Sequence, residues 1–158
     1  MSYFVVKQLP VPPPDSLSGE LGWLGTTPTQ FMADRALELC YTSWSMRSAA
    51  ISIQPTLPPF RWEPARREAL RCELDGLVFA IAGTPREDVV HILDSFPKVQ
   101  VKDEAEFGEY RTKRLILERY DAMVDAEAAG REYETILDPP PADPSLCHPE
   151  STRPDWAR

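Results

Sequence analysis

The sequence predicts a mainly α-helical chain of about four helices joined by Pro-rich loops, with one strand-like segment at the N-terminus. Apolar residues recur at helical spacing in four stretches, and glycines and prolines fall between these stretches. Only one short run is rich in β-branched and aromatic residues. With 158 residues, the chain is long enough for one domain with a modest core.

Residues 1–28 are expected to form a strand followed by a Pro- and Gly-rich lead-in. The run SYFVVKQL, residues 2–9, is typical of a strand, and it stops at Pro10 and the prolines after it. Because no later stretch has comparable strand character, we expect this segment to pair with a sheet that lies elsewhere.

Residues 29–130 are expected to contain the helices. Thr29 is expected to cap a first helix over FMADRALELCYTSW, and a second is expected to run from Pro64, at its first position, to Ala82. The stretch Thr84-Pro85-Arg86-Glu87 has the pattern of a capping box, and it predicts a third helix that Pro97 ends.

A loop is expected over residues 98–109, before a last helix from about Arg111 to Ala129 that Gly130 closes. Residues 131–158 are rich in proline and poor in apolar residues. We expect them to form a disordered, acidic and Pro-rich tail.

Charge and cysteine content exclude several classes of protein. The net charge of −8 argues against strong autonomous binding to nucleic acid, which usually requires a basic excess. The three cysteines are far apart, no cluster has the spacing of a metal site, and no apolar stretch is long enough to span a membrane. These observations predict a reduced cytoplasmic protein with no metal and no membrane partner.

A basic cluster lies at the start of the last predicted helix, in the stretch EFGEYRTKRLILERY. On a helical wheel, Arg111 and Arg114 lie opposite the apolar stripe, where they could straddle a phosphate or pair with neighbouring carboxylates. Lys113 falls within the apolar stripe, so its ammonium group must reach solvent or find a partner.

The sequence contains no recognisable set of catalytic residues. The stretch from Asp138 to Pro141 has a proline where the target-binding loop of amino-methyltransferases has an aromatic residue, and no Gly-rich turn of a nucleotide site occurs. We therefore expect no catalytic residue and no cofactor-binding residue, and we do not expect the chain to be an enzyme by itself.

Five stretches, taken in order, resemble one protein family: YFVVKQLPVPPP, FMADRALELCYTSW with Met46-Arg47 after it, PPFRWEPARREALRCELDGLVFAIAG, TPREDVVHILDSFP and KDEAEFGEYRTKRLILERYDAM. The family is the C-terminal part of large adenine-specific DNA methyltransferases of restriction-modification systems, of the type IIG kind. The resemblance runs from Tyr3 to about Asp143 and is carried best by ILDSFP and by KDE with GEYRTKRLILE.

The resemblance implies a non-catalytic module within or just after the target-recognition region, and a truncated or split gene product. Full-length members transfer a methyl group from S-adenosylmethionine to adenine, and their cofactor loop and NPPY motif lie upstream. The implied partners are the upstream methyltransferase region or polypeptide and, in that context, double-stranded DNA. The candidate DNA contacts are basic residues in or near the resembling stretches: Lys98, Lys102, Arg111, Lys113 and Arg114. The alternative is a structural protein–protein interaction module without direct DNA contact, which the acidic net charge favours.

Overall fold

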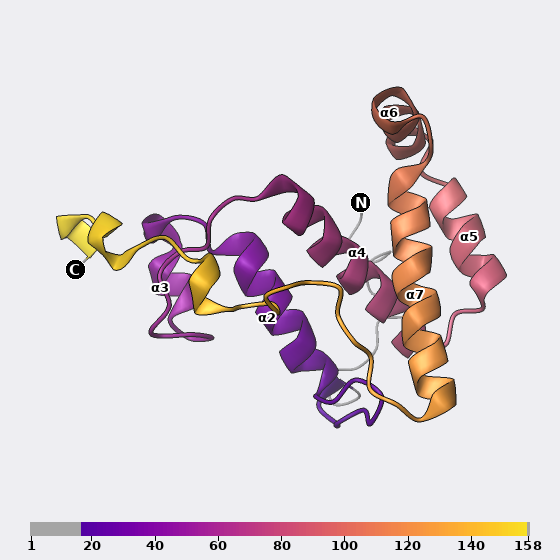
Figure 1. The fold of residues 1–158 in the computed structure, drawn as a ribbon, viewed down its shortest axis with the longest axis horizontal. Helices are drawn as coiled ribbons and strands as arrows, with labels where there is room; N and C mark the ends of the chain where they lie inside the picture. The colour runs from indigo at the N-terminus through magenta and orange to yellow at the C-terminus, as the bar shows by residue number, and fades with distance from the viewer. Residues whose placement is uncertain (1–16, 158) are drawn as a thin grey trace, which may run out of the picture.

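The computed structural model describes residues 17–157, which form six α-helices and four short 3-10 helices (Figure 1). Within this range there is no strand, and only two isolated β-bridges occur, Leu21 with Thr26 and Phe60 with Cys147. The mainly helical class is confirmed, with more helices than the four predicted. The predicted strand over residues 2–9 lies outside the described residues.

The first long helix, α2 (Pro28–Cys40), starts and ends differently from the prediction. Thr27, not Thr29, is its N-cap, and the Thr27 hydroxyl accepts a hydrogen bond from the Gln30 backbone N–H. The Thr29 hydroxyl instead donates to the Leu17 carbonyl. The helix ends at Cys40, and a 3-10 helix (η2, Trp44–Met46) and a four-residue helix (α3, Arg47–Ala50) follow.

Helices α4 (Pro64–Ile81) and α7 (Arg111–Ala129) form the centre of the fold, and both agree with the sequence prediction. Pro64 lies in the first turn of α4, and Gly130 closes α7 in the left-handed conformation, with φ 61°. The two helices run parallel, since Glu68 faces Arg111 and Gly76 contacts Tyr120. A Cβ atom at Gly76 would lie 3.0 Å from the Tyr120 backbone nitrogen, so glycine permits this close approach.

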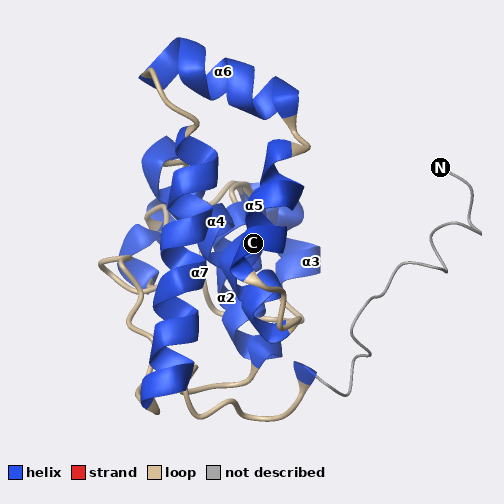
Figure 2. Cartoon of the chain, turned by 90° about the vertical axis from the view of Figure 1, so that its right-hand side faces the viewer, coloured by secondary structure: helices blue, strands red, loops and turns tan. Residues whose placement is uncertain are grey.

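Two helices connect α4 to α7, whereas the sequence predicted one helix and a loop. Helix α5 covers Arg86–Asp94, and its N-cap position is Pro85 without any side-chain cap, so the predicted capping box at Thr84 is wrong. The predicted loop over residues 98–109 is also wrong, because α6 (Pro97–Phe107) occupies most of it. Pro97 begins this helix, and Gly108 ends it with φ 75°. Figure 2 shows α6 lying across the ends of α5 and α7.

Three apolar clusters hold the helices together. The first joins α2, α4 and α7 through residues such as Phe31, Leu77 and Met123. The second joins α2 to the linker before α4 and to the C-terminal chain, around Tyr41 and Phe60. The third joins α4, α5 and α7, and it contains Val89, Leu93, Ile116, Tyr120 and Cys72.

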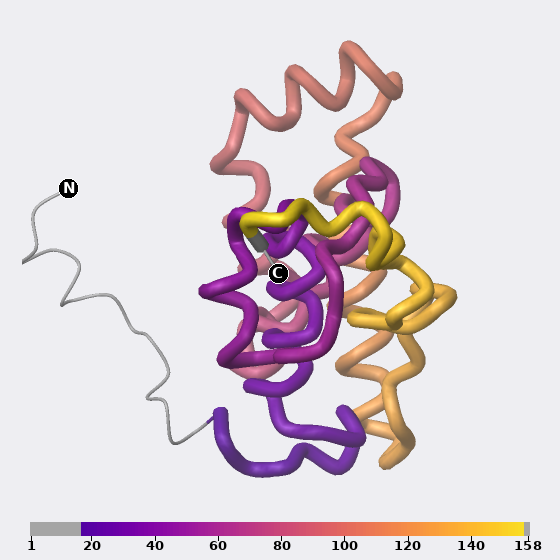
Figure 3. The backbone as a smooth tube through the Cα atoms, turned by 90° about the vertical axis from the view of Figure 1, so that its left-hand side faces the viewer, coloured from indigo at the N-terminus to yellow at the C-terminus, as the bar shows by residue number. Residues whose placement is uncertain are grey.

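The C-terminal segment is packed against the helices over much of its length, so the prediction of a disordered tail is wrong. Its buried side chains are Tyr133, Leu137, Leu146 and Cys147. The segment returns over the linker between α3 and α4 (Figure 3), where Arg61 donates hydrogen bonds to the Ser145 and Leu146 carbonyls. These apolar residues are few and follow neither helical nor strand spacing in a Pro-rich sequence, which hid their role in the core.

Candidate nucleic-acid interface

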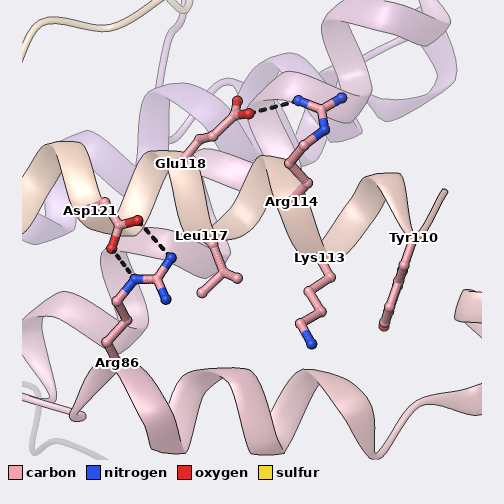
Figure 4. Close-up of a pocket in the computed structure, with 7 residues that line it drawn as sticks. All are labelled: Arg86, Tyr110, Lys113, Arg114, Leu117, Glu118 and Asp121. Carbon is pink, nitrogen blue, oxygen red and sulfur yellow. Dashed lines mark hydrogen bonds and ion pairs between the residues drawn. The ribbon is translucent and has the colours of Figure 1, made fainter.

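The five basic residues predicted to contact DNA lie in two neighbouring hollows around the first turns of α7. Lys113 and Arg114 line a shallow hollow of about 280 Å³ between α5 and α7 (Figure 4). Lys98, Lys102 and Arg111 line a larger groove of about 620 Å³ between α4, α6 and α7. The candidates therefore do not form one continuous basic surface.

In the hollow between α5 and α7, each basic side chain is already paired with a carboxylate. The Lys113 ammonium lies 2.5 Å from Asp94 on α5, which is the partner that its position in the apolar stripe required. Arg114 donates hydrogen bonds to Glu109 and Glu118, and Arg86 forms two hydrogen bonds with Asp121. Figure 4 shows Lys113 directed toward α5 and Arg114 directed away from it.

These ion pairs change the proton affinities of the groups in them. The pKa of Arg114 is raised, chiefly because its guanidinium donates hydrogen bonds to Glu109 and then to Glu118. The same contact lowers the pKa of the Glu109 carboxyl. The pKa of Arg86 is raised chiefly by its hydrogen bonds to Asp121. A phosphate that bound here would have to compete with carboxylates that already hold the cations.

The groove between α4 and α6 has a balanced charge. Four cations line it, Lys98, Lys102, Arg71 and Arg111, and so do four acids, Glu68, Asp75, Asp103 and Glu106. Arg111 pairs with Glu68 at 2.9 Å, and its guanidinium lies 4.7 Å from the centre of the Phe107 ring. Asp103 is buried and accepts a hydrogen bond of 2.6 Å from the Thr112 backbone N–H. Asp103 therefore provides an acceptor for one of the backbone N–H groups that have no partner within the first turn of α7.

The sequence interpretation missed a buried ionic network under the C-terminal segment. Arg35 on α2 contacts Glu73 on α4 at 2.7 Å, and the other oxygen of Glu73 accepts hydrogen bonds from Tyr133 and Thr135. The Arg35 guanidinium also lies 3.1 Å from the centre of the Phe31 ring. One sequence signal was available, because Arg35 follows Phe31 by four residues and therefore shares its buried helix face.

A second buried pair, Arg66 with Glu38, lies beside the first. Glu38 also accepts a hydrogen bond from the Ala142 backbone N–H, and Arg66 donates to the Pro140 carbonyl. Together the two networks fasten residues 133–142 to α2 and α4. Every carboxylate in them has protein partners, which is the arrangement of a structural network.

Among the described residues, no group of three or more His, Cys, Asp or Glu side chains could hold a metal ion. No helix among residues 17–157 combines the length and the apolar character needed to cross a bilayer. Comparison with known proteins gives no match to any protein family, to any curated protein or to any solved structure.

Proposed function

We propose that this chain is a non-catalytic helical module of an adenine-specific restriction-modification DNA methyltransferase, and that it docks onto the rest of that enzyme through α6. The sequence resemblance supports the family. The exposure of α6 is the observation that carries the docking role, and the pairing of the basic residues argues against a preformed phosphate clasp.

Helix α6 packs against α7, but it buries almost none of its own side chains. Of its residues only Asp103 is buried, while Val99, Val101 and Phe107 are exposed, Val101 to 66%. Phe96, directly before the helix, and Ile92 on α5 are also exposed. Short helices depend largely on tertiary packing for their stability. Val99 and Phe107 line the groove toward α4 and α7, whereas Val101 is not among the residues of that groove. Val101 is therefore the apolar side chain of α6 that a docked partner would cover.

A second candidate function is contact with the DNA backbone, and the arrangement of Lys98 and Lys102 favours it. The two lysines are four residues apart on α6, and they line the same groove as Arg71 and Arg111. Groups placed in this way could contact a phosphate at the edge of a docked complex.

The experiment compares two variants for binding to the methyltransferase polypeptide that the proposal requires as a partner. Val101→Asp should weaken docking by about tenfold or more, because it places a charge in the apolar contact. Val78→Asp on α4 is the control, since Val78 is also an exposed valine, at 47%, but lies outside α6. Affinities are measured by calorimetry. Equal affinities of Val101→Asp and the unchanged chain would contradict the docking role.

DNA titration of the same complex distinguishes the second candidate. Under the docking proposal, replacing Arg111, Lys113 and Arg114 together by alanine leaves the DNA affinity and its salt dependence unchanged. If these residues hold phosphates, affinity falls for all DNA sequences and the slope of log K against log salt becomes shallower by about one for each lost contact. Lys98→Ala with Lys102→Ala makes the same test for the groove.

A further inference from the structure

A surface of different character lies at the other side of the molecule, where the end of α2 meets α3. It contains an apolar hollow of about 160 Å³, lined by residues that include Leu37, Cys40, Tyr41, Met46 and Ile53. Met46, Ile51 and Ile53 are exposed to 40%, 47% and 49%. We call these three side chains and the hollow the α3 patch.

The α3 patch is almost free of charge, although the chain as a whole is highly charged. Residues 40–60 contain one charged side chain, Arg47, in a sequence that is 27% charged. The Arg47 guanidinium lies 5.8 Å from the centre of the Trp44 ring, and Arg153 lies 5.6 Å from the same ring. Depletion of charge with exposed Met and Ile side chains is the composition of an interface core, and it is unlike an ordinary solvated surface.

A buried polar group at the hollow also lacks a protein partner. Tyr41 lines the hollow and is only 2% exposed, yet its hydroxyl forms no hydrogen bond with any described residue. A buried hydroxyl without a hydrogen-bond partner is destabilising.

We propose that two copies of this chain associate through the α3 patch. Charge is the first consideration, because it limits the faces through which two copies can meet. Each copy carries a net charge of −8, so most faces of two copies would meet with like charges opposed. The α3 patch can meet its own image without opposing carboxylates from residues 40–60, because that segment contains none.

Shape is the second argument, because a two-fold interface must be complementary to itself. The patch provides both a hollow and a projecting side chain. Ile51 is half exposed and is not among the residues that line the hollow, whereas its neighbours Ala50 and Ile53 do line it. A cavity of roughly 150 Å³ accommodates a group the size of benzene. The hollow therefore has the size to take one isoleucine side chain from the other copy.

The test is sedimentation of the full chain from about 1 µM to about 1 mM, a range that covers weak to moderate affinities. We expect a monomer–dimer equilibrium. Ile51→Asp should raise the dissociation constant by about tenfold or more, because it removes buried apolar area and adds two charges across the symmetry axis. Val101→Asp on α6 is the matched control, and it should dimerise as the unchanged chain does.

Labelling of Cys40 gives an independent readout at the patch itself. Of the three cysteines only Cys40 is exposed, whereas burial raises the pKa of Cys72 to about 12 and that of Cys147 to about 11. Because the thiolate is the reactive form, a disulfide reagent reports on Cys40. Its labelling should slow as the protein concentration rises, and in Ile51→Asp it should be independent of concentration.

Two results would overturn the proposal. One is a chain that remains monomeric and labels at a constant rate up to about 1 mM. The other is a dimer that Ile51→Asp and the control Val101→Asp leave equally intact, which would place the contact on another surface. Circular dichroism of each variant establishes that the helices are retained.

Discussion

Two regions of this molecule use ion pairs in opposite ways. Around the first turns of α7, the pairs of Lys113 and Arg114 are at the surface and each links neighbouring helical turns or helices. Under the C-terminal segment, the pairs Arg35–Glu73 and Arg66–Glu38 are buried and connect α2, α4 and residues 133–142. Surface pairs are screened by solvent, whereas a buried carboxylate that loses its partner remains in an apolar environment.

The difference teaches that the number of charges in a region says little about their role. DNA contacts were predicted on the α7 surface because its cations are clustered in the sequence. The buried pairs are less conspicuous, yet they determine whether the C-terminal segment is attached. Stability measurements on both regions should separate the two roles.

The largest effect is expected for Glu73→Ala. This change leaves the buried Arg35 without its carboxylate and removes the acceptor of Tyr133 and Thr135, so the free energy of unfolding should fall by about 3–5 kcal/mol. Urea unfolding followed by circular dichroism measures it. Glu87→Ala, an exposed acid on α5, is the control. A loss equal to that of the control would show that the buried network is not formed.

High pH should lower the free energy of unfolding through both regions, because each contains a buried thiol. The pKa of Cys72 is raised from 9.0 to about 12 and that of Cys147 from 9.0 to about 11, in both cases chiefly by burial. The thiols of the unfolded chain ionise at lower pH than the buried ones. The contribution of the two thiols to the free energy of unfolding is therefore fully present below pH 9.0 and is lost as the pH rises through the folded pKa values.

At about pH 10 the loss of unfolding free energy should be about 3 kcal/mol for the two thiols together. Unfolding curves at several pH values check it, with Cys72→Ala and Cys147→Ala separating the two contributions. If both variants keep the full alkaline loss, other groups cause it.

A smaller effect is expected for Tyr133→Phe, which sharpens the assignment of the buried network. The variant keeps the ring against Phe31 and removes only the hydroxyl that donates to Glu73, which Thr135 and Arg35 still contact. We expect a loss of about 0.5–1.5 kcal/mol. Thermal or urea unfolding measures it, and a loss as large as that of Glu73→Ala would place most of the energy at Tyr133.

The smallest effect is expected for Arg114→Ala on the α7 surface. Arg114 is exposed, and its pairs with Glu109 and Glu118 are in contact with solvent. The variant should unfold close to the unchanged chain, and any difference should disappear at high salt. Urea unfolding at low and at high ionic strength tests this, and a large loss that salt does not reduce would contradict it.

Local signals in the sequence predicted the two central helices well. Pro64 and Gly130 mark ends of α4 and α7, and the periodic apolar residues of α7 include the buried Ile116, Tyr120 and Met123. Helix α6 was missed for a physical reason. It buries no apolar stripe, so it has no helical periodicity to detect, and Pro97 was interpreted only as the end of α5 although it also begins α6.

The candidate site was predictable only in part. The helical wheel placed Lys113 where it needed a partner, but the sequence could not identify Asp94 as that partner. The buried network was harder to predict from the sequence than the Lys113 pair. Glu73 and Tyr133 are 60 residues apart, and Glu38 and Ala142 are 104 residues apart. No local pattern records such contacts, since they depend on the path of the C-terminal segment across the helices.

The attachment of residues 133–142 has a consequence for how the protein is made. Ala142 is synthesised 104 residues after Glu38, which at about 5–20 residues per second is a delay of about 5–20 seconds. During that interval the carboxylates of α2 and α4 exist on the nascent chain before their last partners have been translated. The final packing of these helices is therefore a late event of biosynthesis, and a ribosome that stalls near residue 130 would hold an incomplete core.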